Sequence, residues 1–145
     1  MTITLSDEQY RRVVILTMLG EWMVNATRQE PDSDFEVAAS QLYSFAKGTH
    51  AEKLVSYDDE ATQWVASDES DAEIHAFIDD YDDKTFWEDL TTRMAERDLV
   101  ADRGERTVNG MRSGERVRAI QTYAKKYVDE FEKYGLERLV LLERR

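Results

Sequence analysis

The sequence of 145 residues has no cysteine, only one proline and few glycines. The lack of cysteine excludes disulfide bonds, thiolate metal ligands and cysteine nucleophiles, and it suits a reducing compartment. Long apolar runs are also missing. The longest nearly apolar stretch, residues 13–19, is far shorter than the roughly 20 residues of a membrane-spanning helix. Early acidic residues replace the basic region of a secretory signal, so we expect a cytoplasmic protein without a membrane partner.

The common catalytic motifs are absent as well. The chain contains no GxSxG, HExxH or GxGxxG pattern, and the glycines between residues 104 and 110 lack the lysine and the spacing of a phosphate-binding loop. We therefore expect a protein that is not an enzyme and that uses no cofactor and no resident metal.

What is present is enough apolar material for one folded domain, residues 1–145. Hydrophobic residues make up 41% and aromatic residues 10% of the chain, which is not a disordered composition. Ser6 and Gln9 have the spacing of a helix capping box, and the residues after them are apolar around the whole helical circumference. The sequence predicts an all-α fold, with five or six helices around a buried N-terminal helix over residues 7–28.

Apolar spacings of three and four residues, together with Gly48 and Gly135 as expected helix ends, place the remaining helices. A second capping box is expected at Ser70, a helix break after residues 82–83, and a loop with a tight turn at residues 108–111. Two short apolar segments, residues 2–5 and 139–142, are expected to pair as a two-stranded sheet. The expected helices span residues 35–47, 50–55, 59–66, 70–78, 85–101 and 114–134.

Charge is distributed unevenly along the chain, whose net charge is −12. Residues 1–29 contain three acids and three bases, residues 30–102 contain 21 acids and five bases, and residues 103–145 contain seven acids and 11 bases. The middle of the chain is therefore strongly acidic, and its C-terminal third is mildly basic.

The densest acidic residues are candidates for a binding surface. Carboxylates at short spacing are the ligands that calcium and magnesium take, but the run does not fit an EF-hand, because Lys84 and Leu90 stand where that loop needs glycine and glutamate. His75 shares a helical face with acids one turn away on either side, which would suit a zinc ion. A solvated helix junction explains the same pattern. The candidate acids are Asp68, Asp71, Asp79, Asp80, Asp82 and Asp83.

A second candidate region is the basic group around the glycine-containing loop. Cations at the start of a helix oppose its dipole, so local stability does not explain them. Arg106, Arg112, Ser113 and Arg116 could hold an anion, or the arginines could pair with the acidic middle of the same chain. We expect the second arrangement. A winged-helix interpretation of residues 85–111 fails because the would-be recognition helix has the wrong charge for DNA.

For function, the sequence favours a non-catalytic protein-binding or regulatory module. Its acidic residues, roughly 58–89, would engage a partner protein with a basic surface and deter nucleic acid. One alternative is a magnesium-dependent phosphohydrolase that uses the clustered carboxylates. Another is a structural homodimer that buries residues 139–142 against a second copy.

Overall fold

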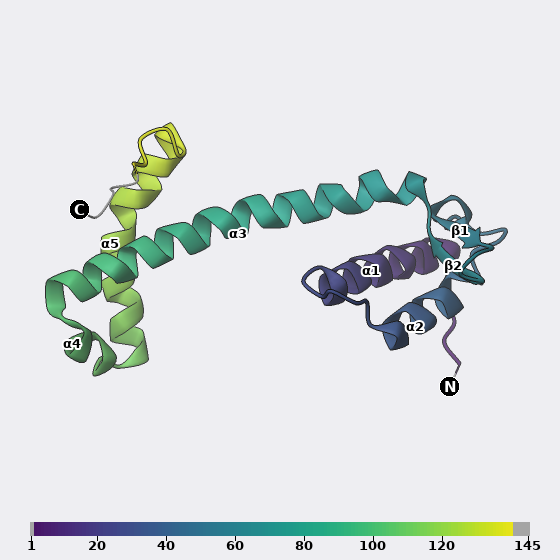
Figure 1. Cartoon of the computed structure of the whole chain (residues 1–145), viewed down its shortest axis with the longest axis horizontal. Helices are drawn as coiled ribbons and strands as arrows, with labels where there is room; N and C mark the ends of the chain where they lie inside the picture. Colours follow the sequence, from purple (N-terminus) through teal and green to yellow (C-terminus); the bar gives the residue numbers. More distant parts are fainter. Residues whose placement is uncertain (1, 141–145) are drawn as a thin grey trace. The chain divides into compact units, whose positions relative to one another are not determined.

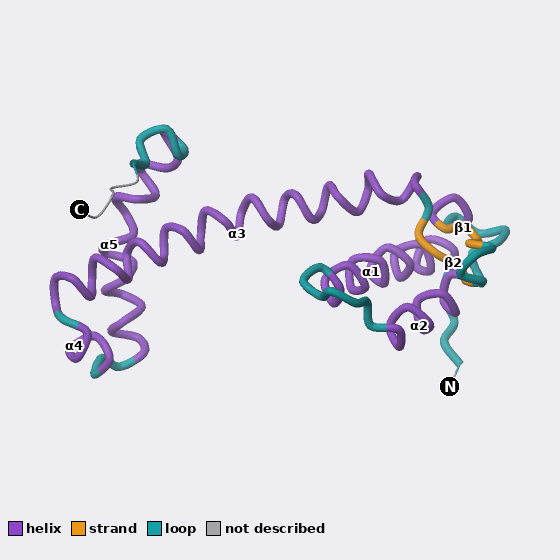
Figure 2. Tube along the Cα trace, in the orientation of Figure 1, coloured by secondary structure: helices purple, strands orange, loops and turns teal. Residues whose placement is uncertain are grey.

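The computed structural model describes residues 2–140 and confirms a mainly α fold (Figures 1 and 2). The chain forms two compact units, Met1–Asp80 and Tyr81–Arg145. The expectation of one domain stays a prediction. The elements are α1 (Asp7–Asn25), α2 (Ser33–Tyr43), a 3₁₀ turn (Glu52–Leu54), β1 (Val55–Asp58), β2 (Gln63–Ala66), α3 (Asp68–Arg103), α4 (Glu105–Asn109) and α5 (Ser113–Tyr134).

Helix α1 begins as expected but is less buried than expected. The backbone N–H of Gln9 donates to Ser6 Oγ over 3.3 Å, and the Gln9 side chain accepts from the Ser6 N–H over 2.9 Å, which confirms the capping box. Only one face of the helix is buried, because α2 covers that side while Leu16 and Met23 remain 67% and 54% exposed. The expectation of a helix surrounded by the others is therefore wrong.

A β-hairpin in the middle of the chain forms the sheet. Strands β1 and β2 pair antiparallel, with Val55 opposite Ala66. The Asp58 carboxylate caps the turn by accepting two backbone N–H groups, over 2.8 and 3.0 Å. These local bonds stabilise a hairpin where we expected a helix over residues 59–66. The expected terminal pair is not found: residues 2–5 form no strand, and residues 141–142 of its partner lie outside the described residues.

The core of the first unit lies between α1, α2, the hairpin and the start of α3. Helix α2 packs against both α1 and β2, and the Trp64 N–H donates to Ser40 Oγ over 2.9 Å. Tyr43, at the end of α2, is 1% exposed and is the largest fully buried side chain. The buried residues are Val14, Ile15, Met18, Ala39, Tyr43, Ala46, Ala51, Leu54, Val55, Ile74 and Ile78.

Helix α3 is a single helix of 36 residues, where the sequence predicted two shorter helices. The expected capping box at Ser70 is wrong, because the helix begins at Asp68, and the buried Ser70 hydroxyl donates to the carbonyl of Ser67 over 2.6 Å. The expected break after residues 82–83 is wrong too. No proline or glycine interrupts residues 68–103, so the acidic run continues the helix rather than ending it.

The second unit contains the later part of α3, the short helix α4 and α5. Leu99, Val108 and Ala119 form its buried core. Helix α4 is entered through Gly104, with a φ of 79°, and ends at Asn109. The Met111 N–H donates to the Val108 carbonyl over 3.2 Å, so the tight turn expected at residues 108–111 is present and overlaps the end of this short helix. Gly135 ends α5 as expected, with a φ of 55° and its N–H bonded to the Phe131 carbonyl over 2.9 Å.

Within residues 2–140, none of the helices has the length and apolarity needed to cross a lipid bilayer.

Candidate functional site

The six predicted acids all lie on α3 and all are exposed. Asp68, Asp71, Asp79 and Asp80 belong to the first unit, whereas Asp82 and Asp83 belong to the second. Residues 68–89 of this helix contain ten acids against one lysine. The structure thus places the predicted acids on one helix and leaves their carboxylates in solvent.

Few of these acids have partners inside the protein. Asp71 lies 3.3 Å from Nδ1 of His75, one turn along the helix, and Asp83 accepts from the indole N–H of Trp87 over 3.1 Å. Among the described residues, the carboxylates of Asp68, Asp79, Asp80 and Asp82 take part in no hydrogen bond or ion pair. These four carboxylates are therefore available to bind another molecule.

Within the described residues, the side chains are not arranged in a way that favours a magnesium or zinc site. Across residues 2–140, no group of three or more histidine, aspartate or glutamate side chains is placed to hold a metal ion. His75 contacts Asp71 alone of the two acids expected beside it, and its Nδ1 also lies 2.9 Å from the Asp71 carbonyl. His50 lies in the same unit but faces Glu8, at 3.9 Å.

The predicted basic residues lie around α4 and the start of α5. Arg116 forms an ion pair with Glu96 of α3 over 3.0 Å, which is one contact with the acidic middle of the chain. Arg112 precedes α5 without capping it through its side chain, Ser113 is the first residue of α5, and Arg106 lies in α4. In the part of the chain that the structure describes, Arg106 and Arg112 form no ion pair. Both hypotheses for this group stay predictions.

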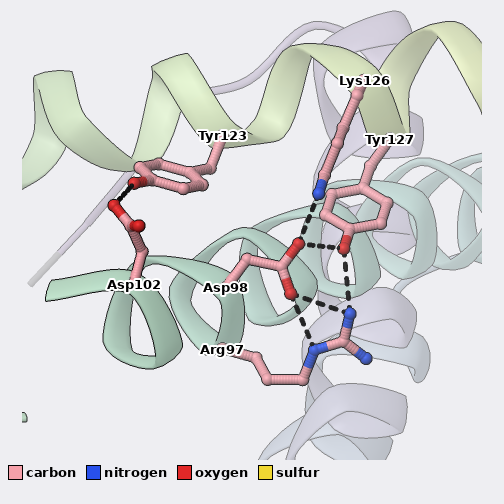
Figure 3. Close-up of polar contacts among 6 residues, drawn as sticks. All are labelled: Arg97, Asp98, Asp102, Tyr123, Lys126 and Tyr127. Atoms are coloured by element: carbon pink, nitrogen blue, oxygen red, sulfur yellow. Dashed lines mark hydrogen bonds and ion pairs between the residues drawn. The ribbon is translucent and has the colours of Figure 1, made fainter. Parts of the chain in front are cut away.

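A polar network joins α3 to α5 in the second unit, and sequence reasoning did not find it (Figure 3). Asp98 accepts from Lys126 Nζ over 2.5 Å, from the Tyr127 hydroxyl, and from the neighbouring Arg97 over 2.9 Å. These bonds, of which the one from Lys126 has the largest effect, hold the pKa of Asp98 well below its usual range. The Asp98 side chain is 20% exposed. The network positions two helices and leaves no open acceptor for a ligand.

Replacing Asp98 by asparagine should therefore lower stability in a pH-dependent way. Because the pKa of Asp98 is lower in the folded protein, its stabilising contribution is present above the unfolded-state pKa, about 4, and is lost as the pH falls toward the folded-state pKa. We expect Asp98→Asn to reduce the free energy of unfolding by roughly 1 kcal/mol at pH 7 and by less at pH 3, where part of the contribution is already lost. Urea unfolding at both pH values measures the difference. An equal loss at both would contradict this role, and Asp129→Asn on the outside of α5 is the control.

A cavity of about 350 Å³ opens in the first unit, between α1, α2, β2 and the start of α3. Two indoles, Trp22 and Trp64, and three carboxylates, Glu21, Glu36 and Asp71, are among its lining residues, which include no lysine or arginine. Of the lining residues, Asp71 and His75 were sequence candidates. The signal that sequence reasoning missed is Glu21, which is the only charged residue between positions 13 and 27 of an otherwise apolar helix.

Among the carboxylates that line this cavity, Glu21 is the one that is hydrogen-bonded to a core residue. Its Oε2 accepts a hydrogen bond from the hydroxyl of buried Tyr43 over 3.0 Å. Burial raises the pKa of Glu21, the Tyr43 bond lowers it, and the charge of Glu36 raises it further, with a raised pKa as the result. Burial likewise raises the pKa of Tyr43, so its hydroxyl stays a donor at neutral pH. The cavity therefore has a carboxylate whose charge is incompletely compensated by the fold.

Comparison with known proteins gives no match: neither a protein-family model, nor a curated protein, nor a solved structure matches this chain.

Proposed function

We propose that this protein is a non-catalytic binding module that engages a basic surface of a partner protein. The binding residues are Asp68, Asp79 and Asp80 on the part of α3 in the first unit, and we call these three residues the acidic surface. The observation that carries the proposal is that all three carboxylates are exposed and, among the described residues, unpaired.

Helical geometry supports a shared surface. Asp68 and Asp79 are eleven residues apart, which is close to three full turns, so they lie on the same face of α3. Exposed charges of one sign attract an oppositely charged protein and speed its encounter, and the attraction extends over a Debye length of about 8 Å at physiological salt. The same charges repel the phosphates of nucleic acid. A partner protein with clustered lysines and arginines fits these properties.

The alternatives have less support. A magnesium-dependent hydrolase needs carboxylates that converge on one ion, and the described residues offer no such group. The homodimer hypothesis rests on residues 139–142. Of these, Leu139 and Val140 are 43% and 74% exposed, and the other two lie outside the described residues.

Neutralising the acidic surface should weaken binding to a basic probe. We expect the triple variant Asp68→Asn, Asp79→Asn, Asp80→Asn to bind a synthetic lysine- and arginine-rich peptide at least tenfold more weakly than the natural sequence does at low salt. Calorimetric titration at two salt concentrations measures this, and high salt should weaken binding of the natural sequence.

The matched control removes the same charge from the second unit, through Glu115→Gln, Asp129→Asn and Glu137→Gln. All three positions are exposed. This control should keep most of the affinity. If the two triple variants bind equally well, net charge rather than the acidic surface governs binding and the proposal fails.

A further inference from the structure

The cavity of the first unit combines features that the proposed function does not use. Its lining includes apolar side chains from α1, β2 and α3, namely Met18, Val65 and Ile74, and its polar groups are carboxylates, amides and the imidazole of His75. We propose that this cavity binds the ammonium group of an aliphatic amine, with the charge beside Glu21 and Glu36 and the methylene stem against Trp22 and Trp64. This inference is independent of the acidic surface.

The carboxylates supply the first part of the recognition. Tyr43 occupies Oε2 of Glu21, and among the described residues no group donates to its Oε1. Glu36 acts on Glu21 through its charge alone, so these two carboxylates repel each other. The third carboxylate of the cavity, Asp71, lies 3.3 Å from Nδ1 of His75, which also lines the cavity. No lysine or arginine lines the cavity, and within the described residues neither glutamate forms an ion pair. A bound ammonium would offset both the cost of burying the Glu21 charge and the repulsion from Glu36, the two effects that raise the pKa of Glu21.

The indoles supply the second part. An indole face attracts a cation within about 6 Å of the ring, and it also packs well against methylene groups. Trp64 is held in place by its backbone bond to Ser40 and by an edge-on contact with Tyr57, at 5.4 Å between ring centroids. Trp22 packs against the core of the same unit. A site fixed on two elements in this way loses little freedom when a ligand enters it.

The cavity fits an organic cation better than a metal ion. Calcium and magnesium take six or more oxygen ligands, and across residues 2–140 no three acidic or histidine side chains are placed to hold a metal. An ammonium group needs only three acceptors. Glu21, Glu36 and the amide oxygen of Gln63 supply acceptors around the cavity. Its volume of about 350 Å³ suits a small ligand.

Calorimetric titration with n-butylammonium chloride tests the proposal. We expect saturable binding, at least tenfold tighter than that of ammonium chloride, which has the charge without the stem. We expect no binding of n-butanol, which has the stem without the charge. N-acetyl-lysine amide distinguishes the two sources of this chemistry: binding as tight as that of butylammonium indicates a protein lysine, and weaker binding indicates a free amine. Failure of both amines to bind overturns the inference.

The decisive variant is Glu21→Gln, which keeps an oxygen acceptor for Tyr43 but removes the charge. It should weaken butylammonium binding at least tenfold, whereas Glu115→Gln, in the second unit, should leave it unchanged. Trp64→Leu should weaken it as well. Circular dichroism checks that each variant is folded. If Glu21→Gln folds and binds butylammonium as tightly as the natural sequence, the cavity is not the site. Because the acidic-surface variant leaves all these lining residues intact, it should bind butylammonium normally even if the proposed function fails.

Discussion

Leu99→Ala should lower the free energy of unfolding of the second unit by about 3 kcal/mol. Leu99 is fully buried on α3, where it forms a core with Val108 of α4 and Ala119 of α5. The substitution removes apolar contacts and leaves a cavity, and so small a core has few neighbours that can fill it. Urea unfolding followed by circular dichroism measures the loss.

The control for this prediction is Leu136→Ala, because Leu136 is 47% exposed. It should change the free energy of unfolding by less than about 1 kcal/mol. A similar loss for both variants would mean that Leu99 is not a core residue. The same experiment tests the expectation of a single domain: if the whole chain unfolds cooperatively, Leu99→Ala shifts one transition, and if the units are independent, part of the helical signal keeps its original midpoint.

Tyr43→Ala should have a comparable effect on the first unit, with a loss of about 4 kcal/mol. Tyr43 fills the core between α1 and α2, and its hydroxyl is the hydrogen-bond donor to Glu21. The alanine variant removes the ring and the donor together. Thermal or urea unfolding should show a strongly destabilised or unfolded first unit.

Two further substitutions separate these contributions. Tyr43→Phe keeps the ring and removes only the donor to Glu21, so we expect a smaller loss, of about 1 kcal/mol. Phe45→Ala, two residues away, changes an aromatic residue that is 66% exposed and should be nearly neutral. A loss on Phe45→Ala as large as that on Tyr43→Ala would contradict the assignment of Tyr43 to the core.

The parts of the fold that could be predicted from the sequence are those governed by local chemistry. The capping box at Ser6 and the glycine that ends α5 were both predicted correctly, because each depends on bonds within a few residues. The hairpin was missed because its strands have only four residues each and its stability depends on the cap of its turn by Asp58 and on contact with α2. Pairing of that kind has no long periodic signal in the sequence.

The candidate sites also contain one part that local chemistry predicts and one part that depends on the folded structure. Exposure of the acids on α3 follows from composition, and residues as polar as Asp79 and Asp80 are seldom buried. The cavity could not be predicted, because Glu21, Glu36 and Trp64 come from α1, α2 and β2 and meet only after the first unit folds. The one clue along the chain was a single acid within the apolar part of α1.

The continuous helix α3 contains one stretch whose backbone hydrogen bonds have little protection from side-chain packing. All residues from Asp79 to Lys84 are exposed, so this stretch of helix is held by its own hydrogen bonds and by hardly any side-chain packing. Isolated helical turns are marginal in water, and most helical stability in proteins comes from a buried face. Hydrogen bonds in this stretch therefore break at a much smaller cost in free energy than those around Leu99 or Tyr43. The position where the sequence suggested the end of a helix is thus a stretch of continuous helix with little packing to hold it.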